Sequence, residues 1–84
     1  MNISDLPVGA AFTVRKVRSG REVGKRLVDM GFTEGASGRL LRKAFLSGPL
    51  QVEIRGYDVI IRRSEAAMIE VAEDDQGAGD ARTA

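Results

Sequence analysis

The fold is decided by one stretch in the middle of the chain, Leu50-Gln51-Val52-Glu53-Ile54-Arg55-Gly56-Tyr57-Asp58-Val59-Ile60-Ile61. Its first six residues alternate strictly between apolar and polar side chains, which is the period of a strand with one buried face. We therefore expect Leu50, Val52 and Ile54 to face a core. The run Gly56-Tyr57-Asp58 predicts a tight turn into a second strand over residues 59–63, so that the whole stretch forms a β-hairpin.

Short apolar segments on either side of this hairpin are separated by glycine about every ten residues, which is typical of a small β-barrel or sandwich. A strand begins near Phe12, and its alternation slips by one residue between Val14 and Val17, which predicts a β-bulge near residues 15–16. A strand of mixed pattern covers residues 36–45, and a last short strand covers residues 69–71. Together these segments predict a mainly β fold, a small and partly open SH3-like barrel of about five strands.

One inserted α-helix is predicted at about residues 20–30. It begins where Ser19 and Glu22 have the spacing of a capping box, in which the two side chains satisfy free backbone N–H groups of the first turn. Its apolar face is the stripe formed by Val23, Leu27 and Met30.

The helix is predicted to end at Gly31 in a left-handed conformation. In the resulting Schellman motif, Phe32 packs back on Leu27. A single helical turn near residues 65–68, capped by Ser64, is expected before the last strand.

Composition excludes most kinds of chemistry. The chain has 84 residues, no cysteine and no histidine, so it lacks thiol and imidazole nucleophiles, bases and metal ligands. A domain of this size holds one modest core and no deep active-site cavity. The acidic side chains of the predicted domain are spread singly, which disfavours acid–base catalysis by paired carboxylates and a tight metal site. We expect no enzyme activity, no catalytic residue, no cofactor and no resident metal.

The chain divides into two parts by charge. Residues 73–84 carry four acidic side chains against one arginine, which leaves a net charge of +4 on residues 1–72. We predict a folded domain over 1–72 and a disordered acidic tail over 73–84, because the tail has no large apolar side chain to bury. No apolar run approaches the ~18 residues that span a bilayer, and the N-terminus has no signal-peptide pattern, so we expect a complete, cytoplasmic chain.

Three motifs, in this order, resemble the FeoA family. They are Gly24-Lys25-Arg26-Leu27-Val28-Asp29-Met30-Gly31-Phe32-Thr33-Glu34-Gly35, Ser47-Gly48-Pro49-Leu50-Gln51-Val52-Glu53-Ile54-Arg55-Gly56-Tyr57 and Ile61-Arg62-Arg63-Ser64-Glu65-Ala66-Ala67-Met68-Ile69-Glu70-Val71. The family pattern is a helix ending in Leu-x-x-Met/Leu-Gly, a Gly-Pro before the central hairpin and a Glu-Ala turn before the last strand. The likeness covers residues 6–71. Glu34 and Phe45 stand at turn or edge positions where proline is common in the family.

The resemblance implies an accessory protein of the FeoB ferrous-iron transporter, a membrane protein with a cytosolic GTPase domain. It implies a cytoplasmic SH3-like barrel that acts by protein–protein contact, without catalysis and without carrying iron. We expect the docking surface to be a groove between the helix end and a loop that faces it, formed by Arg26, Met30, Phe32, Leu46, Pro49 and Tyr57. The alternative for Met30 and Phe32 is a place in the core, which is the favoured interpretation for the neighbouring Leu27.

The basic residues near the predicted helix start form a second candidate surface, for an acidic partner or anionic lipid: Arg15, Lys16, Arg18, Arg21, Lys25 and Arg26. The favoured interpretation is a solvated face neutralised by Glu22 and Asp29.

Two other functions stay open at this point, binding of single-stranded RNA and binding of proline-rich peptides. Both rely on several exposed aromatic side chains. The chain has one tyrosine and three phenylalanines, and we expect Phe12 and Phe32 to be buried. We therefore predict no nucleic-acid partner.

The strand at residues 69–71 is expected to lie exposed at the edge of the sheet, where it could pair with a second chain. We predict a monomer or weak oligomer.

Overall fold

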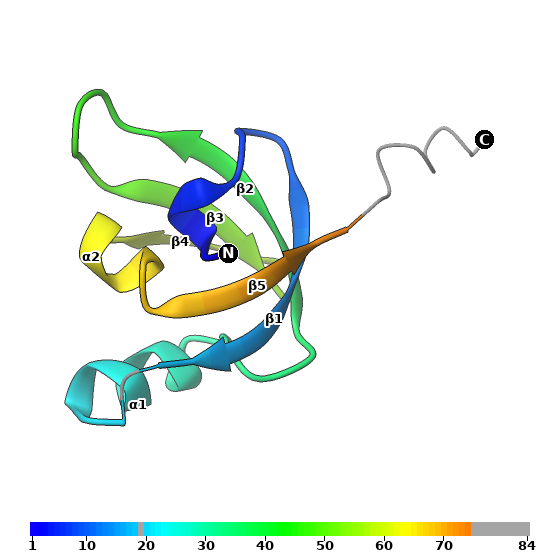
Figure 1. Cartoon of the computed structure of the whole chain (residues 1–84), viewed down its shortest axis with the longest axis vertical. Coiled ribbons are helices and arrows are strands. Elements are labelled where there is room, and N and C mark those ends of the chain that lie inside the picture. Colours follow the sequence, from blue (N-terminus) through cyan, green and yellow to red (C-terminus); the bar gives the residue numbers. More distant parts are fainter. Residues whose placement is uncertain (19, 75–84) are drawn as a thin grey trace.

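The computed structural model describes residues 1–18 and 20–74. These residues form η1 (Ile3–Asp5), β1 (Ala11–Val17), α1 (Glu22–Asp29), β2 (Ser37–Lys43), β3 (Leu50–Ile54), β4 (Tyr57–Ile61), α2 (Arg63–Ala66) and β5 (Ile69–Glu73). The strands make one antiparallel sheet in the order β4-β3-β2-β1-β5 (Figure 1). The predicted mainly β fold with one inserted helix is confirmed.

The sheet curls into a partly open barrel around one core. Within the described residues β4 and β5 do not pair, and η1 and α2, which contact each other, lie at this opening (Figure 1). On β3 the inward side chains alternate as predicted, with Leu50, Val52 and Ile54 all fully buried. The buried apolar residues are Ile3, Leu6, Phe12, Val14, Leu27, Phe32, Ala36, Leu40, Leu50, Val52, Ile54, Ile61, Ala66, Ile69 and Val71.

Two register shifts bend the sheet. The first lies between Val14 and Lys16 on β1, where the sequence predicted a bulge. The second lies between Leu40 and Arg42 on β2 and was not predicted, because that strand has no clear alternation to interrupt. Bulges increase local twist, which helps a small sheet close on itself.

The hairpin turn between β3 and β4 lies one residue earlier than predicted. Arg55 and Gly56 are its two central residues, both with positive φ (51° and 88°), which is the geometry of a type I′ turn. Tyr57 and Asp58, expected in the turn, are instead the first residues of β4 and pair with Ile54 and Glu53.

Helix α1 ends as predicted and begins differently. The N–H of Phe32 donates to the Leu27 carbonyl (3.0 Å) and the N–H of Gly31 donates to the Val28 carbonyl (2.9 Å), the two bonds of a Schellman motif. At the other end Arg21 is the N-cap residue and makes no side-chain capping bond. The expected capping residue Ser19 lies outside the described residues.

The second helical turn, α2, begins earlier than the predicted residues 65–68. Ser64 lies inside it, and the preceding Arg62 is the N-cap residue. Glu65 Oε1 accepts the backbone N–H of Arg62 (2.8 Å), and the Glu65 carboxylate also pairs with the Arg26 guanidinium of α1. Glu65 is buried, so this carboxylate ties α2 to α1 from inside the fold.

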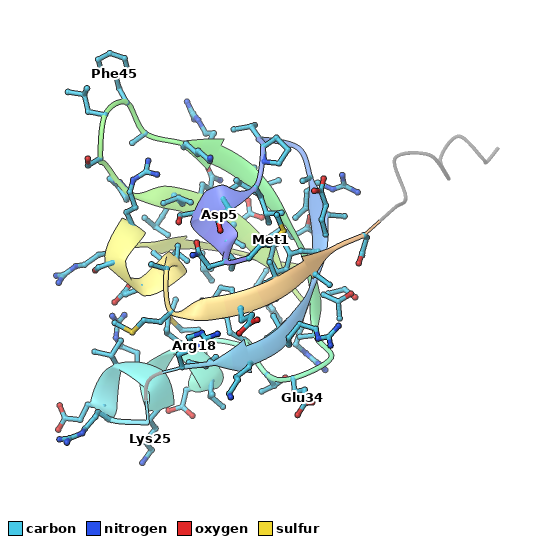
Figure 2. All side chains as sticks on the ribbon, in the orientation of Figure 1. Met1, Asp5, Arg18, Lys25, Glu34 and Phe45 are labelled. Atoms are coloured by element: carbon cyan, nitrogen blue, oxygen red, sulfur yellow. The ribbon has the colours of Figure 1, made fainter. Side chains whose placement is uncertain are left out.

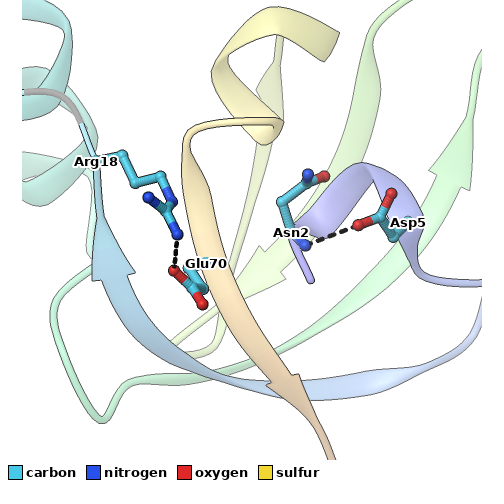
Figure 3. A network of polar contacts seen from close by, with 4 residues as sticks. All are labelled: Asn2, Asp5, Arg18 and Glu70. Carbon is cyan, nitrogen blue, oxygen red and sulfur yellow. Dashed lines mark hydrogen bonds and ion pairs between the residues drawn. The ribbon is translucent and has the colours of Figure 1, made fainter.

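The N-terminal residues cover the edge of β5 that was predicted to be exposed. Asn2 forms an isolated bridge with Glu70, and the N–H of Val71 donates to the Met1 carbonyl (2.9 Å). Figure 3 shows Asn2 bonded to the Asp5 carboxylate at the start of η1, and Arg18 paired with Glu70 at 2.6 Å. Part of this strand edge is therefore unavailable to a second chain.

The folded domain extends beyond the predicted boundary at residue 72. Strand β5 includes Glu73, and Asp74 donates its N–H to the Ala11 carbonyl and accepts the Thr13 hydroxyl (both 2.9 Å). The rest of the predicted disordered tail, residues 75–84, lies outside the described residues.

Gly38 in β2 leaves no room for a side chain. A Cβ there would clash with the Glu53 carbonyl oxygen and come within 2.7 Å of Phe12 Cζ. We expect Gly38→Ala to lower the free energy of unfolding by about 2 kcal/mol through overpacking, which is a fall of roughly 8–16 °C in melting temperature. Gly20→Ala is the control, because nothing lies within 4 Å of that position. Equal melting temperatures for the two variants would contradict this packing constraint.

The buried carboxylate of Glu65 should contribute more to the free energy of unfolding than a more exposed carboxylate does. We expect Glu65→Ala to lower the free energy of unfolding by about 2–3 kcal/mol, because Arg26 loses its partner and the Arg62 N–H loses its acceptor. Glu70→Ala, which removes the more exposed pair with Arg18, should cost below ~1 kcal/mol. Urea unfolding of both variants compares them, and a cost for Glu70→Ala as large as that for Glu65→Ala would refute the assignment.

Candidate functional site

The six predicted docking residues do not form one groove. Leu46 and Pro49 precede β3, whereas Tyr57 pairs with Ile54 at its other end. The four steps of about 3.3 Å along β3 separate the two groups by ~13 Å. Figure 2 shows Phe45, beside Leu46, at one end of the molecule and Lys25, on α1, at the other. The helix end and the loop therefore make two separate surfaces.

Phe32 belongs to neither surface. Its side chain is fully buried in the core, and its backbone N–H closes the Schellman motif of α1. Leu27 is fully buried too. The core alternative considered for both residues is correct, and Phe32 is withdrawn as a candidate contact residue.

The helix-end surface consists of Arg26, Met30, Arg55 and Tyr57. Met30 packs partly on the core, and its sulfur lies 4.0 Å from Arg26 Nη1. The next residue, Gly31, packs against Ile54 and Arg55. Side-chain carbons of these two residues lie 3.5–3.7 Å from the point where a Cβ on Gly31 would be. Tyr57, the partner of Ile54 in β4, is 72% exposed. The end of α1 thus packs beside the β3–β4 turn, and Tyr57 is the first residue after that turn.

The second surface is built on the loop between β2 and β3. The N–H of Ala44 donates to the Pro49 carbonyl (2.9 Å), and the N–H of Gly48 donates to the Phe45 carbonyl (3.3 Å). These bonds close a compact loop whose tip residues Phe45 and Leu46 are 88% and 79% exposed.

Basic and apolar side chains from β2, β4 and α2 flank this tip. A hollow of about 340 Å³ is lined in part by Arg42, Lys43, Phe45, Pro49 and Ile60, and a neighbouring hollow is lined in part by Pro49, Arg62 and Arg63. The loop surface consists of Arg42, Lys43, Phe45, Leu46, Pro49, Ile60, Arg62 and Arg63.

Phe45 and Ile60 were missing from the candidate residues. Each lies in a short apolar run, Ala44-Phe45-Leu46 and Val59-Ile60-Ile61. In a strand, neighbouring side chains point to opposite faces, so a run of three must place at least one apolar side chain outward. That signal was present in the sequence for Ile60, which is 61% exposed.

Two of the basic residues around the start of α1 are held in ion pairs. Arg18 pairs with Glu70, and Arg26 pairs with Glu65. The expectation of a partly neutralised face holds for these two arginines, but the partners are not the predicted Glu22 and Asp29. They come from β5 and α2, which are remote in sequence.

Neither a metal centre nor a membrane span is found in the part of the chain that the structure describes. No three acidic side chains gather there closely enough to hold an ion. None of the described helices has the length and apolar character needed to cross a bilayer.

Comparison with protein families matches residues 1–73 to the model described as the FeoA domain. A curated relative is the Fe(2+) transport protein A/Fe(2+) transporter FeoB fusion protein of Porphyromonas gingivalis, which is 34% identical over 71 residues. The match covers 84% of this chain and 8% of that protein, so this chain corresponds to a small part of the relative.

Solved structures show the same fold. The solution structure of FeoA from Chlorobium tepidum has 36% identity and a TM-score of 0.81, with 87% of this chain and 70% of that chain covered. FeoA of Stenotrophomonas maltophilia in complex with zinc has 28% identity and a TM-score of 0.76, with 86% and 89% covered. That protein is described as a prokaryotic SH3 domain protein and a candidate activating factor of ferrous iron transport.

These matches confirm the SH3-like barrel that the sequence predicted, and they cover the part of the chain that carries both surfaces. The chain belongs to the FeoA family, whose members are non-catalytic accessory proteins of ferrous iron transport.

Proposed function

We propose that this protein is an accessory of a FeoB-type ferrous iron transporter and binds its cytosolic part by protein–protein contact. The observation that carries this proposal is the Porphyromonas gingivalis relative, which joins a matching domain and FeoB in one chain. A covalent link raises the effective concentration of two modules that must meet, often to the millimolar range for short flexible linkers. Such a fusion is useful only if the two parts act together.

The partner in this proposal is the cytosolic GTPase domain, the part of FeoB-type transporters that the family resemblance implies. The protein would then work in the cytoplasm, next to the membrane in which its partner sits. Its role would be to hold or adjust that domain, without chemistry of its own.

The helix-end surface is our candidate for this contact. Tyr, Met and Arg are enriched in protein interfaces, and Tyr and Arg are among the residue types most often found at binding hot spots. Tyr57, Met30 and Arg55 supply these types from two rigid elements, the Schellman end of α1 and the type I′ turn. A surface held by such turns loses little conformational freedom on binding, which favours affinity. Arg26 is less available to a partner protein because its guanidinium is paired with Glu65.

The RNA-binding alternative is weaker on this geometry. Phe12 and Phe32 are fully buried, which leaves Tyr57 and Phe45 as the exposed aromatic residues of the chain. They lie at opposite ends of the β3–β4 hairpin, whereas stacking platforms place aromatic rings beside one another.

Calorimetry with the isolated GTPase domain of the cognate transporter, with and without a GTP analogue, tests the proposal. We expect measurable binding that Tyr57→Ser weakens by roughly 30-fold or more, as for a hot-spot residue. Val8→Ser is the matched control, because Val8 is also exposed (57%) but lies in the turn before β1. Tyr57 is suitable for substitution because most of its surface is already in water, whereas Met30 packs on the core.

Absence of binding to the GTPase domain in either nucleotide state would overturn the choice of partner. Binding that both Tyr57→Ser and Val8→Ser leave unchanged would keep the partner and reject the helix-end surface.

A further inference from the structure

The tip of the β2–β3 loop projects two large apolar side chains into solvent. Phe45 and Leu46 are 88% and 79% exposed, the highest values among the large apolar side chains of the described residues. Figure 2 shows Phe45 at the extreme end of the molecule, away from α1. Because the tip projects from the molecule, its side chains can insert into another surface, whereas a small ligand would need a hollow.

The backbone of the loop is strained at the apolar residue Leu46. Leu46 has a φ of 62°, and it is the second residue of the turn closed by the Gly48–Phe45 bond. Glycine or asparagine takes such a position with less strain than leucine does. Arg63 holds the strained residue in place by donating from Nη2 to the Leu46 carbonyl (3.2 Å). The loop therefore carries an exposed leucine at a position where its backbone would accept a smaller residue more readily.

The charged side chains of the two segments that flank the tip are all positive. Residues 42–50 and 60–64 include Arg42, Lys43, Arg62 and Arg63 and no acidic residue. The acidic group next along the chain, Glu65, is buried and paired with Arg26. On the side of η1, Lys43 donates to the Ser4 carbonyl (3.2 Å), and the nearby Asp5 carboxylate accepts the Asn2 N–H. Four cationic side chains thus flank the exposed tip, and Asp5 is the acidic group on the side of η1.

We propose that the loop surface docks on an anionic phospholipid membrane. Phe45 and Leu46 enter the boundary between headgroups and acyl chains, and the four basic side chains contact lipid phosphates. An apolar tip flanked by basic side chains combines the two forces that hold peripheral proteins on membranes, burial of apolar area and attraction to anionic lipid. The long arginine and lysine side chains can keep their charges at the headgroup level while the tip lies deeper.

A lipid surface fits these observations better than a protein groove does. The basic residues flank the tip on two sides, Arg42 and Lys43 at the end of β2 and Arg62 and Arg63 at the start of α2. Positive charge on both sides of an apolar tip matches an extended negative surface better than it matches a single carboxylate. The hollow beside Arg42, Lys43 and Ile60 lies next to the tip and has room for a phosphate headgroup. The membrane contact also leaves the helix-end surface free, because that surface is at the other end of the hairpin.

Flotation of the full chain with lipid vesicles tests this proposal without any transporter. We expect the protein to float with vesicles of mixed phosphatidylcholine and phosphatidylglycerol, to stay behind with phosphatidylcholine alone, and to be released as salt is raised. Phe45→Ser with Leu46→Asn should weaken vesicle binding roughly tenfold or more, because the apolar anchor is lost. The same variant should melt no lower than the parent, because asparagine suits a positive φ.

Matched variants test whether vesicle binding depends on the loop surface or only on the total charge and exposed apolar area of the protein. Arg42→Gln with Arg62→Gln should weaken vesicle binding, whereas Arg15→Gln with Lys16→Gln, which removes the same charge elsewhere, should leave it nearly unchanged. Val8→Ser with Tyr57→Ser controls for the loss of exposed apolar area away from the tip.

The proposal is overturned if the parent protein does not bind anionic vesicles, or if the two charge variants weaken binding equally. It is also overturned if the tip variant keeps vesicle binding and instead loses binding to the GTPase domain, because the loop would then be a protein interface. Loss of GTPase-domain binding by Tyr57→Ser bears only on the transporter contact, so the two proposals fail separately.

Discussion

The close packing of three strands at Gly38 is the constraint on which the rest of the structure depends. Gly38 pairs with Phe12 of β1 on one side and with Ile54 of β3 on the other. Because Gly38 has no side chain, the Phe12 ring and the Ile54 side chain occupy the space where its Cβ would be. Side chains of β1 and β3 therefore meet over β2 at this residue. Ile54 in turn contacts Gly31, so the same packing positions the end of α1. The absence of a side chain at Gly38 thus affects both the packing of the sheet and the position of α1.

Strand β3 sets the distance between the two surfaces. Within residues 1–18 and 20–74, the non-glycine residues with positive φ are Leu46 and Arg55, which lie before and after β3. Strained backbone of this kind persists only where the surrounding structure holds it, and it is concentrated at functional sites. Here each strained residue belongs to one surface, Leu46 to the loop surface and Arg55 to the helix-end surface. The buried, fully paired strand between them keeps the two surfaces apart.

The sequence predicted what local chemistry decides. The alternation over residues 50–54, the bulge after Val14 and the Schellman end at Gly31 each depend on a few neighbouring residues, and each is confirmed. The β3–β4 turn was misplaced because arginine at a positive φ gives no turn signal, whereas Gly56-Tyr57-Asp58 does.

Contacts between remote segments decided the candidate site, and they were not predictable from local patterns. The ion pairs of Arg18 and Arg26 with Glu70 and Glu65 depend on how β5 and α2 fold back. The expected groove failed for the same reason, since it assumed that the loop faces the helix end, and no local pattern shows which segments face each other. Only the sheet order shows that the loop and the helix end lie at opposite ends of one hairpin. In a domain whose interior is filled by its core, such opposite ends are the natural places for two different partners. A membrane bound at the loop surface would hold the helix-end surface away from the bilayer, at a height that the length of β3 sets.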